Sequence, residues 1–364
     1  MKIFRRPGLR DLLLPASIIV SFLASSSAPT PLYAAYADLW HFSPITTTTV
    51  FGVYAITVLA ALLVLGRASN HLGRKPVLLG ALALQIAAMI VFGEADCTVA
   101  LFTGRILQGI ATGSALGTLG AMMLDIDRES GTRANAVAPG LGSGTGALFS
   151  GLIVQYLPAP TRLVYAVFIG IFAVQALGVA LLPRGTGRRP GLCAALVLEL
   201  VMPRHLRRAF LAVAPVLFAV WSLGGFYGSL APGLARQLSG SNSVVLGALG
   251  LFVLTVVSST TIIVFARMTA KTMMYLGIAL LVLGSLGTLV AVEASSATGF
   301  FAGASVFGIG FGAGLPITLR GTSATTASGS LPCANIPSTP RTGLTPPRLT
   351  QTVHRRCRRC CVGW

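Results

Sequence analysis

An arginine inside an apolar segment is the residue of this sequence best suited to chemistry within a membrane. Arg105 lies in the apolar run 99–124 and is followed by Gln108 and Gly109. A charged side chain there costs at least about 2.5 kcal/mol on insertion scales, so it normally faces a bundle interior or a water-filled cavity. The alternative is that Arg105 lies near a helix end and extends its charge to the membrane surface. The first interpretation predicts a functional site, and the second predicts only an anchor.

Acidic side chains are absent from the middle of the apolar segments. Asp125 and Asp127 follow the run that contains Arg105, and Glu199 lies in a central polar region. A proton-coupled carrier commonly uses a buried Asp or Glu, so the energy source stays open. Because the apolar segments also hold no nucleophile, acid pair or set of metal ligands, we predict no enzyme, no cofactor and no metal site.

Two other patterns resemble ligand sites, but their context argues against both. The glycine-rich run 139–146 has the composition of a phosphate loop, yet no strand precedes it and it lies in an apolar window. We interpret it as a thin helix that a neighbouring helix approaches closely. In the tail, His354, Cys357 and Cys360 have metal-like spacing, but the arginines between them repel a cation.

Aromatic residues cluster in the first and seventh apolar segments. Tyr36 is typical of the aromatic belt at a membrane surface. Tyr33, Trp221 and Phe226 are candidates to line a cavity, and the belt is the alternative role for them.

The composition excludes an ordinary soluble protein. Hydrophobic residues make up 54% of the 364 and charged residues 10%, with a mean hydropathy of +0.80, whereas soluble domains carry about 25% charged residues. Apolar runs of about 20 residues indicate membrane-spanning helices. We predict an all-α polytopic membrane protein with about ten spans. The first ends at Tyr36, and the others are 46–65, 77–93, 99–124, 134–156, 163–182, 209–232, 244–266, 272–292 and 297–319.

The net charge of +18 follows from membrane topology better than from nucleic-acid binding. Basic residues gather at the N-terminus and in loops around 67–75, 128–133, 184–208 and 267–271. The alternate loops hold mostly acidic residues, with Arg162 and Arg236 as two exceptions. The positive-inside rule then places both termini in the cytoplasm, and we expect the protein in the cell inner (plasma) membrane.

The N-terminus also resembles a signal peptide with twin arginines at Arg5 and Arg6. We interpret it as an uncleaved first span, because apolar residues continue to Tyr36. Pro29 and Pro31 should bend or break the outer half of that span.

Four regions follow from these patterns. We predict a six-helix bundle over 1–183, a cytoplasmic central loop over 184–208, an incomplete bundle of about four helices over 209–320, and a disordered basic tail over 321–364. Faint repeats, such as 104–113 against 303–312, lie six spans apart. Such repeats are typical of transporter folds.

A short cationic loop joins the second and third spans and carries a family motif. The loop Gly-x-Leu-Ala-Asp-Arg-x-Gly-Arg-Lys of the major facilitator superfamily (MFS) is matched at Gly66, Gly73, Arg74 and Lys75, with Asn70 in place of the Asp. The family's Arg-x-x-Gln-Gly motif of the fourth helix is matched by Arg105, Gln108 and Gly109. The chain therefore resembles an MFS transporter over roughly 11–320.

The resemblance implies a two-bundle fold of two six-span halves that works by alternating access. It implies a secondary active transporter of a small solute, with proton-coupled efflux as one form. The expected partners are a small-molecule substrate and the lipid bilayer, with no nucleic acid, and the protein is expected to be a monomer.

The alternative is a remnant or membrane scaffold without transport activity. Two spans of the family pattern are missing where the tail stands, which suggests a truncation or frameshift at the C-terminus. In the family, the loop Asp makes contacts that involve the eleventh helix. Asn70 lacks that charge, and the sequence contains no eleventh span.

Overall fold

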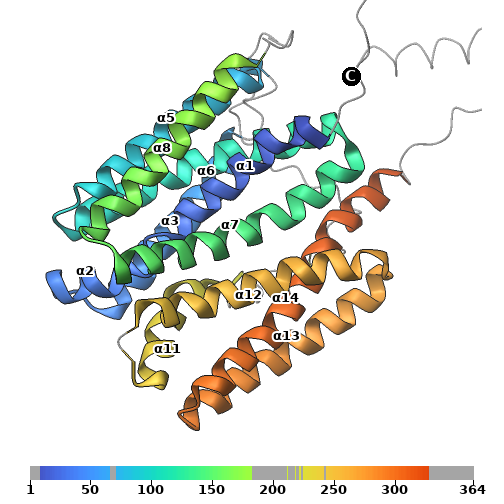
Figure 1. Ribbon diagram of the computed structural model, residues 1–364. Coiled ribbons are helices and arrows are strands. Elements are labelled where there is room, and N and C mark those ends of the chain that lie inside the picture. The colour runs from blue at the N-terminus through green and yellow to red at the C-terminus, as the bar shows by residue number, and fades with distance from the viewer. Residues whose placement is uncertain are drawn as a thin grey trace, which may run out of the picture. The chain divides into compact units, whose positions relative to one another are not determined.

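The structure is a computed structural model that describes residues 9–65, 71–182, 211, 218, 221–222, 224–241 and 243–327. The chain divides into a compact unit, Met1–Gly321, and a second unit, Thr322–Trp364. The described elements are helices: α1 (Leu9–Ser27), α2 (Leu32–Trp40), α3 (Pro44–Leu65), α5 (Arg74–Gly93), α6 (Thr98–Ile126), α7 (Arg128–Tyr156), α8 (Pro160–Leu181), α11 (Ala231–Ser239), α12 (Val244–Val264), the short 3₁₀ helix η1 (Phe265–Arg267), α13 (Ala270–Glu293) and α14 (Ala297–Ala327) (Figure 1).

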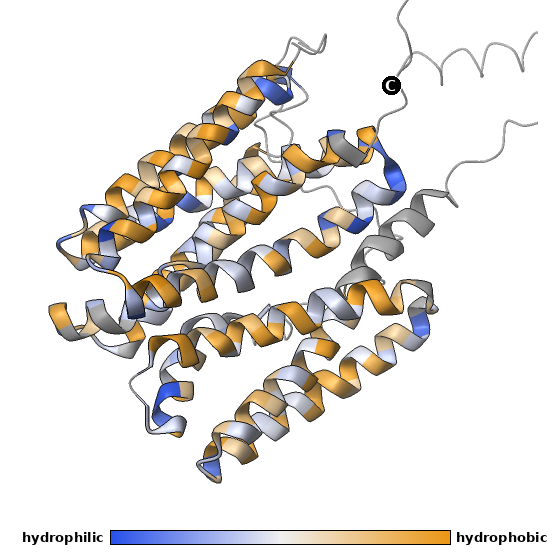
Figure 2. Cartoon of the chain, viewed as in Figure 1, coloured by the Kyte–Doolittle hydropathy of each residue, from blue (hydrophilic) through white to orange (hydrophobic). Residues whose placement is uncertain are grey.

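Eight of these described helices are long and apolar enough to cross a membrane. They are α3, α5, α6, α7, α8, α12, α13 and the part of α14 from Ala297 to Gly314. Apolar residues cover the helix shafts, and hydrophilic residues gather at several helix ends (Figure 2). The predicted all-α polytopic fold is confirmed, and each of these helices matches a predicted apolar window. The central loop 184–208 lies outside the described residues, and the predicted span 209–232 is described only at 211, 218, 221–222 and 224–232.

Two boundaries differ from the windows predicted from hydropathy. Helix α7 begins at Arg128 rather than near 134, because Asp127 caps its first turn by accepting a hydrogen bond from the N–H of Glu129 at 3.0 Å. A hydrogen bond from the Ser130 hydroxyl, together with that N–H, holds the pKa of Asp127 below its usual value. Helix α14 continues to Ala327, past the start of the predicted tail at 321. The polar residues there extend the helix beyond the apolar window that predicted it.

The first predicted span breaks where its prolines lie. Helix α1 ends at Ser27, a turn occupies 28–31, and α2 begins at Leu32. Pro29 has no N–H to continue the helical hydrogen bonds, and its ring disfavours a helical preceding turn. The Pro29 carbonyl accepts hydrogen bonds from the N–H groups of Leu32 and Tyr33, both at 3.0 Å. The predicted break is therefore confirmed, and it leaves the last carbonyls of α1 available for other donors.

The buried apolar residues form two separate clusters. One cluster extends from Leu12 to Val179 and joins α1 to α8, and the other extends from Tyr227 to Phe307. Helices α7 and α12 lie side by side between them (Figure 1). Their contact uses small residues: a Cβ added at Gly151 would lie 2.9 Å from the Cβ of Ala248, and one added at Gly144 would lie 3.3 Å from the Cβ of Thr255. The glycine-rich run is therefore a close-packed helix, as predicted.

Candidate functional site

The side chain of Arg105 is completely buried, with an exposed fraction of 0%. Its Nε and one Nη donate to the Tyr33 hydroxyl at 2.7 and 2.5 Å. The other Nη donates to the Ser26 carbonyl at 2.7 Å and to Oε1 of Gln108 at 2.6 Å. These bonds use four of the five guanidinium N–H groups. Extension of the charge to the membrane surface is therefore excluded.

Aromatic rings complete the surroundings of this charge. The guanidinium carbon lies 5.2 Å from the ring centre of Tyr54, 5.5 Å from that of Tyr33 and 5.7 Å from that of Phe92. Each such contact contributes about 0.5–2 kcal/mol, more when it is desolvated. Among the described residues, Arg105 has no ion pair with a carboxylate. Neutral acceptors and ring faces hold the positive charge.

Glycine at position 109 explains how α3 comes close enough to supply Tyr54. A Cβ added at Gly109 would lie 2.7 Å from the Cβ of Thr57 and 3.1 Å from the carbonyl oxygen of Tyr54. In the motif Arg-x-x-Gln-Gly, Arg105 thus supplies the charge and Gln108 one of its hydrogen-bond acceptors. Gly109 leaves the space that the neighbouring helix α3 needs.

Further buried hydrogen bonds tie the end of α1 to its neighbours. Gln108 donates from Nε2 to the Ser25 carbonyl at 3.1 Å. The other bonds join Gln85 Nε2 to Ser25 Oγ (2.8 Å), Ser21 Oγ to Gln175 Oε1 (2.9 Å) and Ser150 Oγ to the Ala28 carbonyl (2.6 Å). Helices α5, α6, α7 and α8 therefore all bond to α1 or to the turn that follows it.

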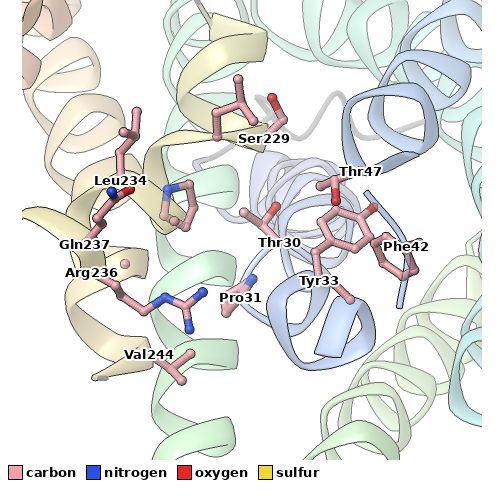
Figure 3. Close-up of a pocket in the computed structure, with 15 residues that line it drawn as sticks. Thr30, Pro31, Tyr33, Phe42, Thr47, Ser229, Leu234, Arg236, Gln237 and Val244 are labelled. Carbon is pink, nitrogen blue, oxygen red and sulfur yellow. The ribbon is translucent and has the colours of Figure 1, made fainter. Parts of the chain in front are cut away.

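A cavity of about 520 Å³ adjoins this network. One wall comes from the turn after α1, from α2 and from the start of α3, and the other comes from residues 229–237 and the start of α12 (Figure 3). Tyr33 belongs to both the cavity and the Arg105 network, because its side chain lines the cavity and its hydroxyl accepts a hydrogen bond from Arg105. Of the three aromatic residues proposed as lining, Trp221 is 65% exposed and Phe226 packs against Tyr227. Neither Trp221 nor Phe226 is among the residues found to line this cavity.

The cationic loop motif lies at the opposite end of these helices. Gly73 has a φ of 91°, a backbone conformation that favours glycine. Arg74 forms an ion pair with Asp125 at the end of α6. Lys75 donates from Nζ to the carbonyls of Ala180 (2.5 Å) and Leu182 (2.7 Å), which end α8. Gly66 and Asn70 lie outside the described residues.

Sequence reasoning missed Tyr54, Gln85, Gln175 and the cavity residue Thr30. The two glutamines were open to detection, because each is a polar residue inside a predicted apolar window. Tyr54 gave no such signal, since a tyrosine is common in membrane helices and only the fold brings it to Arg105.

Eight described helices of membrane-spanning length and apolarity define a polytopic helical membrane protein, and a cavity is lined from both clusters. The family model of the Major Facilitator Superfamily matches residues 15–331. The chain belongs to the Major Facilitator Superfamily.

Solved structures of transporters share this fold. A mutant of the nucleoside transporter NupG has a TM-score of 0.64 and 13% identity, with 89% of this chain and 84% of that chain covered. The xylose transporter XylE from E. coli, in a partially occluded inward-open conformation, has a TM-score of 0.58 and 14% identity, covering 87% and 88%. A bacterial homologue of the human lysosomal transporter Spinster has a TM-score of 0.64 and 14% identity, with 89% of this chain and 78% of that chain covered.

Gln108 and Gln85, both completely buried, provide a matched test of the Arg105 network. Gln108→Leu removes an acceptor of Arg105 and the donor to the Ser25 carbonyl, and hydrogen bonds to charged groups contribute about 1.5–3 kcal/mol each. We expect this variant to lower the thermal unfolding midpoint in detergent by several degrees. Gln85→Leu is the control, because Gln85 is equally buried and bonds to Ser25 Oγ but has no hydrogen bond to Arg105. Equal losses in the two variants would contradict a special role for Gln108.

Proposed function

We propose that this protein is a secondary active carrier that moves a small solute by alternating access between its two bundles. The observation that carries the proposal is the cavity lined from both clusters, which meets the buried Arg105 network at Tyr33. A solute held there contacts both bundles, so a change in their relative angle exposes it to one side of the membrane and then to the other. The carrier acts as a monomer.

Proton-coupled efflux is the form of transport that we propose. Arg105 does not carry the proton, because a guanidinium stays protonated at all pH values that proteins tolerate. It acts as a fixed positive charge whose field reaches the cavity through Tyr33. Another group must therefore take up and release the proton in each cycle.

The protein lies in the inner (plasma) membrane with both termini in the cytoplasm. Arg74 and Lys75 lie at one end of α5, and Glu94 and Asp96 follow its other end. This charge asymmetry supports a cytoplasmic position for the first pair and an outer position for the second.

Cys97 makes the orientation testable. It is exposed and lies next to Asp96, on the proposed outer side. In a variant that retains only Cys97, a membrane-impermeant maleimide should label right-side-out vesicles within minutes and inverted vesicles only after detergent is added. The reverse pattern would place this loop in the cytoplasm and overturn the orientation.

Reconstitution into proteoliposomes tests transport itself. A panel of uridine, D-xylose and benzoate covers a nucleoside, a sugar and an organic anion, and an imposed pH gradient or membrane potential supplies the energy. We expect at least one solute to accumulate in exchange with its unlabelled form, and a pH gradient to drive it. Arg105→Ala should lower that rate about tenfold or more, because the charge is lost and the Ser26 and Tyr33 acceptors lose their donor.

Arg162→Ala is the matched control for loss of an arginine. Its side chain is exposed and forms an ion pair with Glu94 at 3.5 Å, and neither residue is among those found to line the cavity. We expect normal transport from it. No protein-dependent flux of any of the three solutes, or full activity in Arg105→Ala, would count against the proposed carrier mechanism.

A further inference from the structure

One arginine of the cavity has no partner within the part of the chain that the structure describes. Arg236, in the last turn of α11, is half-buried and lines the cavity. Its guanidinium points toward Thr30 and Pro31 of the opposite wall (Figure 3). No hydrogen bond or ion pair of this side chain is found among the described residues. A partly desolvated charge without a protein partner is costly, so such a group is suited to binding an anion.

The opposite wall carries a second unpartnered polar group. Thr30 is only 4% exposed, and its Oγ1 has no hydrogen-bond partner among the described residues. It lines the same cavity. Because a hydroxyl both donates and accepts, Thr30 can donate to an anion placed between it and the guanidinium. Two polar groups without a partner in the described part of the chain therefore line the same cavity, one from each wall.

The charge balance of the cavity also favours an anion. None of the lining residues that the structure describes is acidic. The guanidinium of Arg105 donates to Tyr33, which lines the cavity, and has no carboxylate partner in the described part of the chain. The positive charges of Arg236 in the lining and of Arg105 behind Tyr33's hydroxyl raise the electrostatic potential of the cavity and repel cationic solutes.

Most of the remaining side chains of the lining are apolar, among them Pro31, Ala37, Phe42, Leu230, Leu234 and Val244. Thr47, Ser229 and Gln237 add three neutral polar side chains. A volume of about 520 Å³ lies in the range of cavities that hold a small organic ligand. The site thus combines a cationic end with an apolar body.

We propose that the cavity binds a small organic anion, with a carboxylate between Arg236 and Thr30 and an apolar body against the apolar part of the walls. This inference rests on the proposed function, because it takes that anion to be the transported solute. Arg236 holds the carboxylate through two parallel N–H donors, and Thr30 donates to the same group.

Three isosteric probes test the charge requirement by binding, without transport. The purified protein is placed in phosphatidylcholine nanodiscs and titrated with benzoate, benzamide and benzamidine by calorimetry. We expect benzoate to bind at least about tenfold more tightly than benzamide, and benzamidine not to bind. Equal affinity for benzoate and benzamide, or no benzoate binding, would overturn the proposal.

Variants then assign the binding to the two residues. Arg236→Gln should weaken benzoate at least about tenfold and leave benzamide unchanged. Thr30→Val, which keeps the side-chain shape, should weaken benzoate severalfold. Arg162→Gln removes one positive charge away from the cavity and should leave benzoate binding unchanged. Unchanged benzoate affinity in Arg236→Gln would overturn the site.

An anionic lipid headgroup offers the same chemistry as a solute, and the lipid composition distinguishes the two. Benzoate affinity that is equal in nanodiscs with and without phosphatidylglycerol supports a solute site. A loss of affinity with phosphatidylglycerol that requires Arg236 would overturn the solute assignment in favour of a headgroup. Benzoate binding without any flux of the three transport probes would contradict the carrier function alone, whereas xylose or uridine transport without benzoate binding would contradict only the anion site.

Discussion

The structure depends on how a positive charge is held inside an apolar bundle. The guanidinium of Arg105 has five N–H donors, and an unused donor at membrane depth is costly. Intact helices offer no free carbonyls, since their own backbone uses them. The break after Ser27 supplies the carbonyl of Ser26, and α2 supplies the hydroxyl of Tyr33. The proline-containing turn therefore frees an acceptor that the buried arginine needs, and the arginine satisfies a carbonyl that the turn leaves unbonded.

The same arrangement connects the charge to the cavity. Tyr33 accepts from Arg105 and lines the cavity, so a ligand against its ring lies next to the buried network. Hydrogen bonds with α5, α7 and α8 hold α1 and the turn that follows it in place. The wall from the N-terminal cluster is therefore well fixed. The contact of α7 with α12 through Gly144 and Gly151 is close and uses small side chains, which suits small rotations of packed helices.

Much of this architecture was predictable because bilayers impose simple rules. Apolar windows located the spans, prolines located the break after α1, and the cost of a charge singled out Arg105. The cavity lining was harder. Lipid-facing and core-facing sides of a membrane helix are both apolar, so hydropathy does not give its rotation. Trp221 was therefore proposed as lining although it is exposed, and Arg236 was treated as an exception to the charge rule although it lines the cavity. Partners such as Ser21 and Gln175 lie 154 residues apart, and only the fold joins them.

The most direct test of the central claim is a double-mutant cycle between Arg105 and Tyr33. The free energies of unfolding of wild type, Arg105→Gln, Tyr33→Phe and the double variant are measured by denaturant titration in mixed micelles. If the hydroxyl of Tyr33 holds the guanidinium, the second substitution should cost little once the first is made, with a coupling energy of about 1–3 kcal/mol. Additive effects, within about 0.5 kcal/mol, would show that the two side chains act independently and would contradict the account.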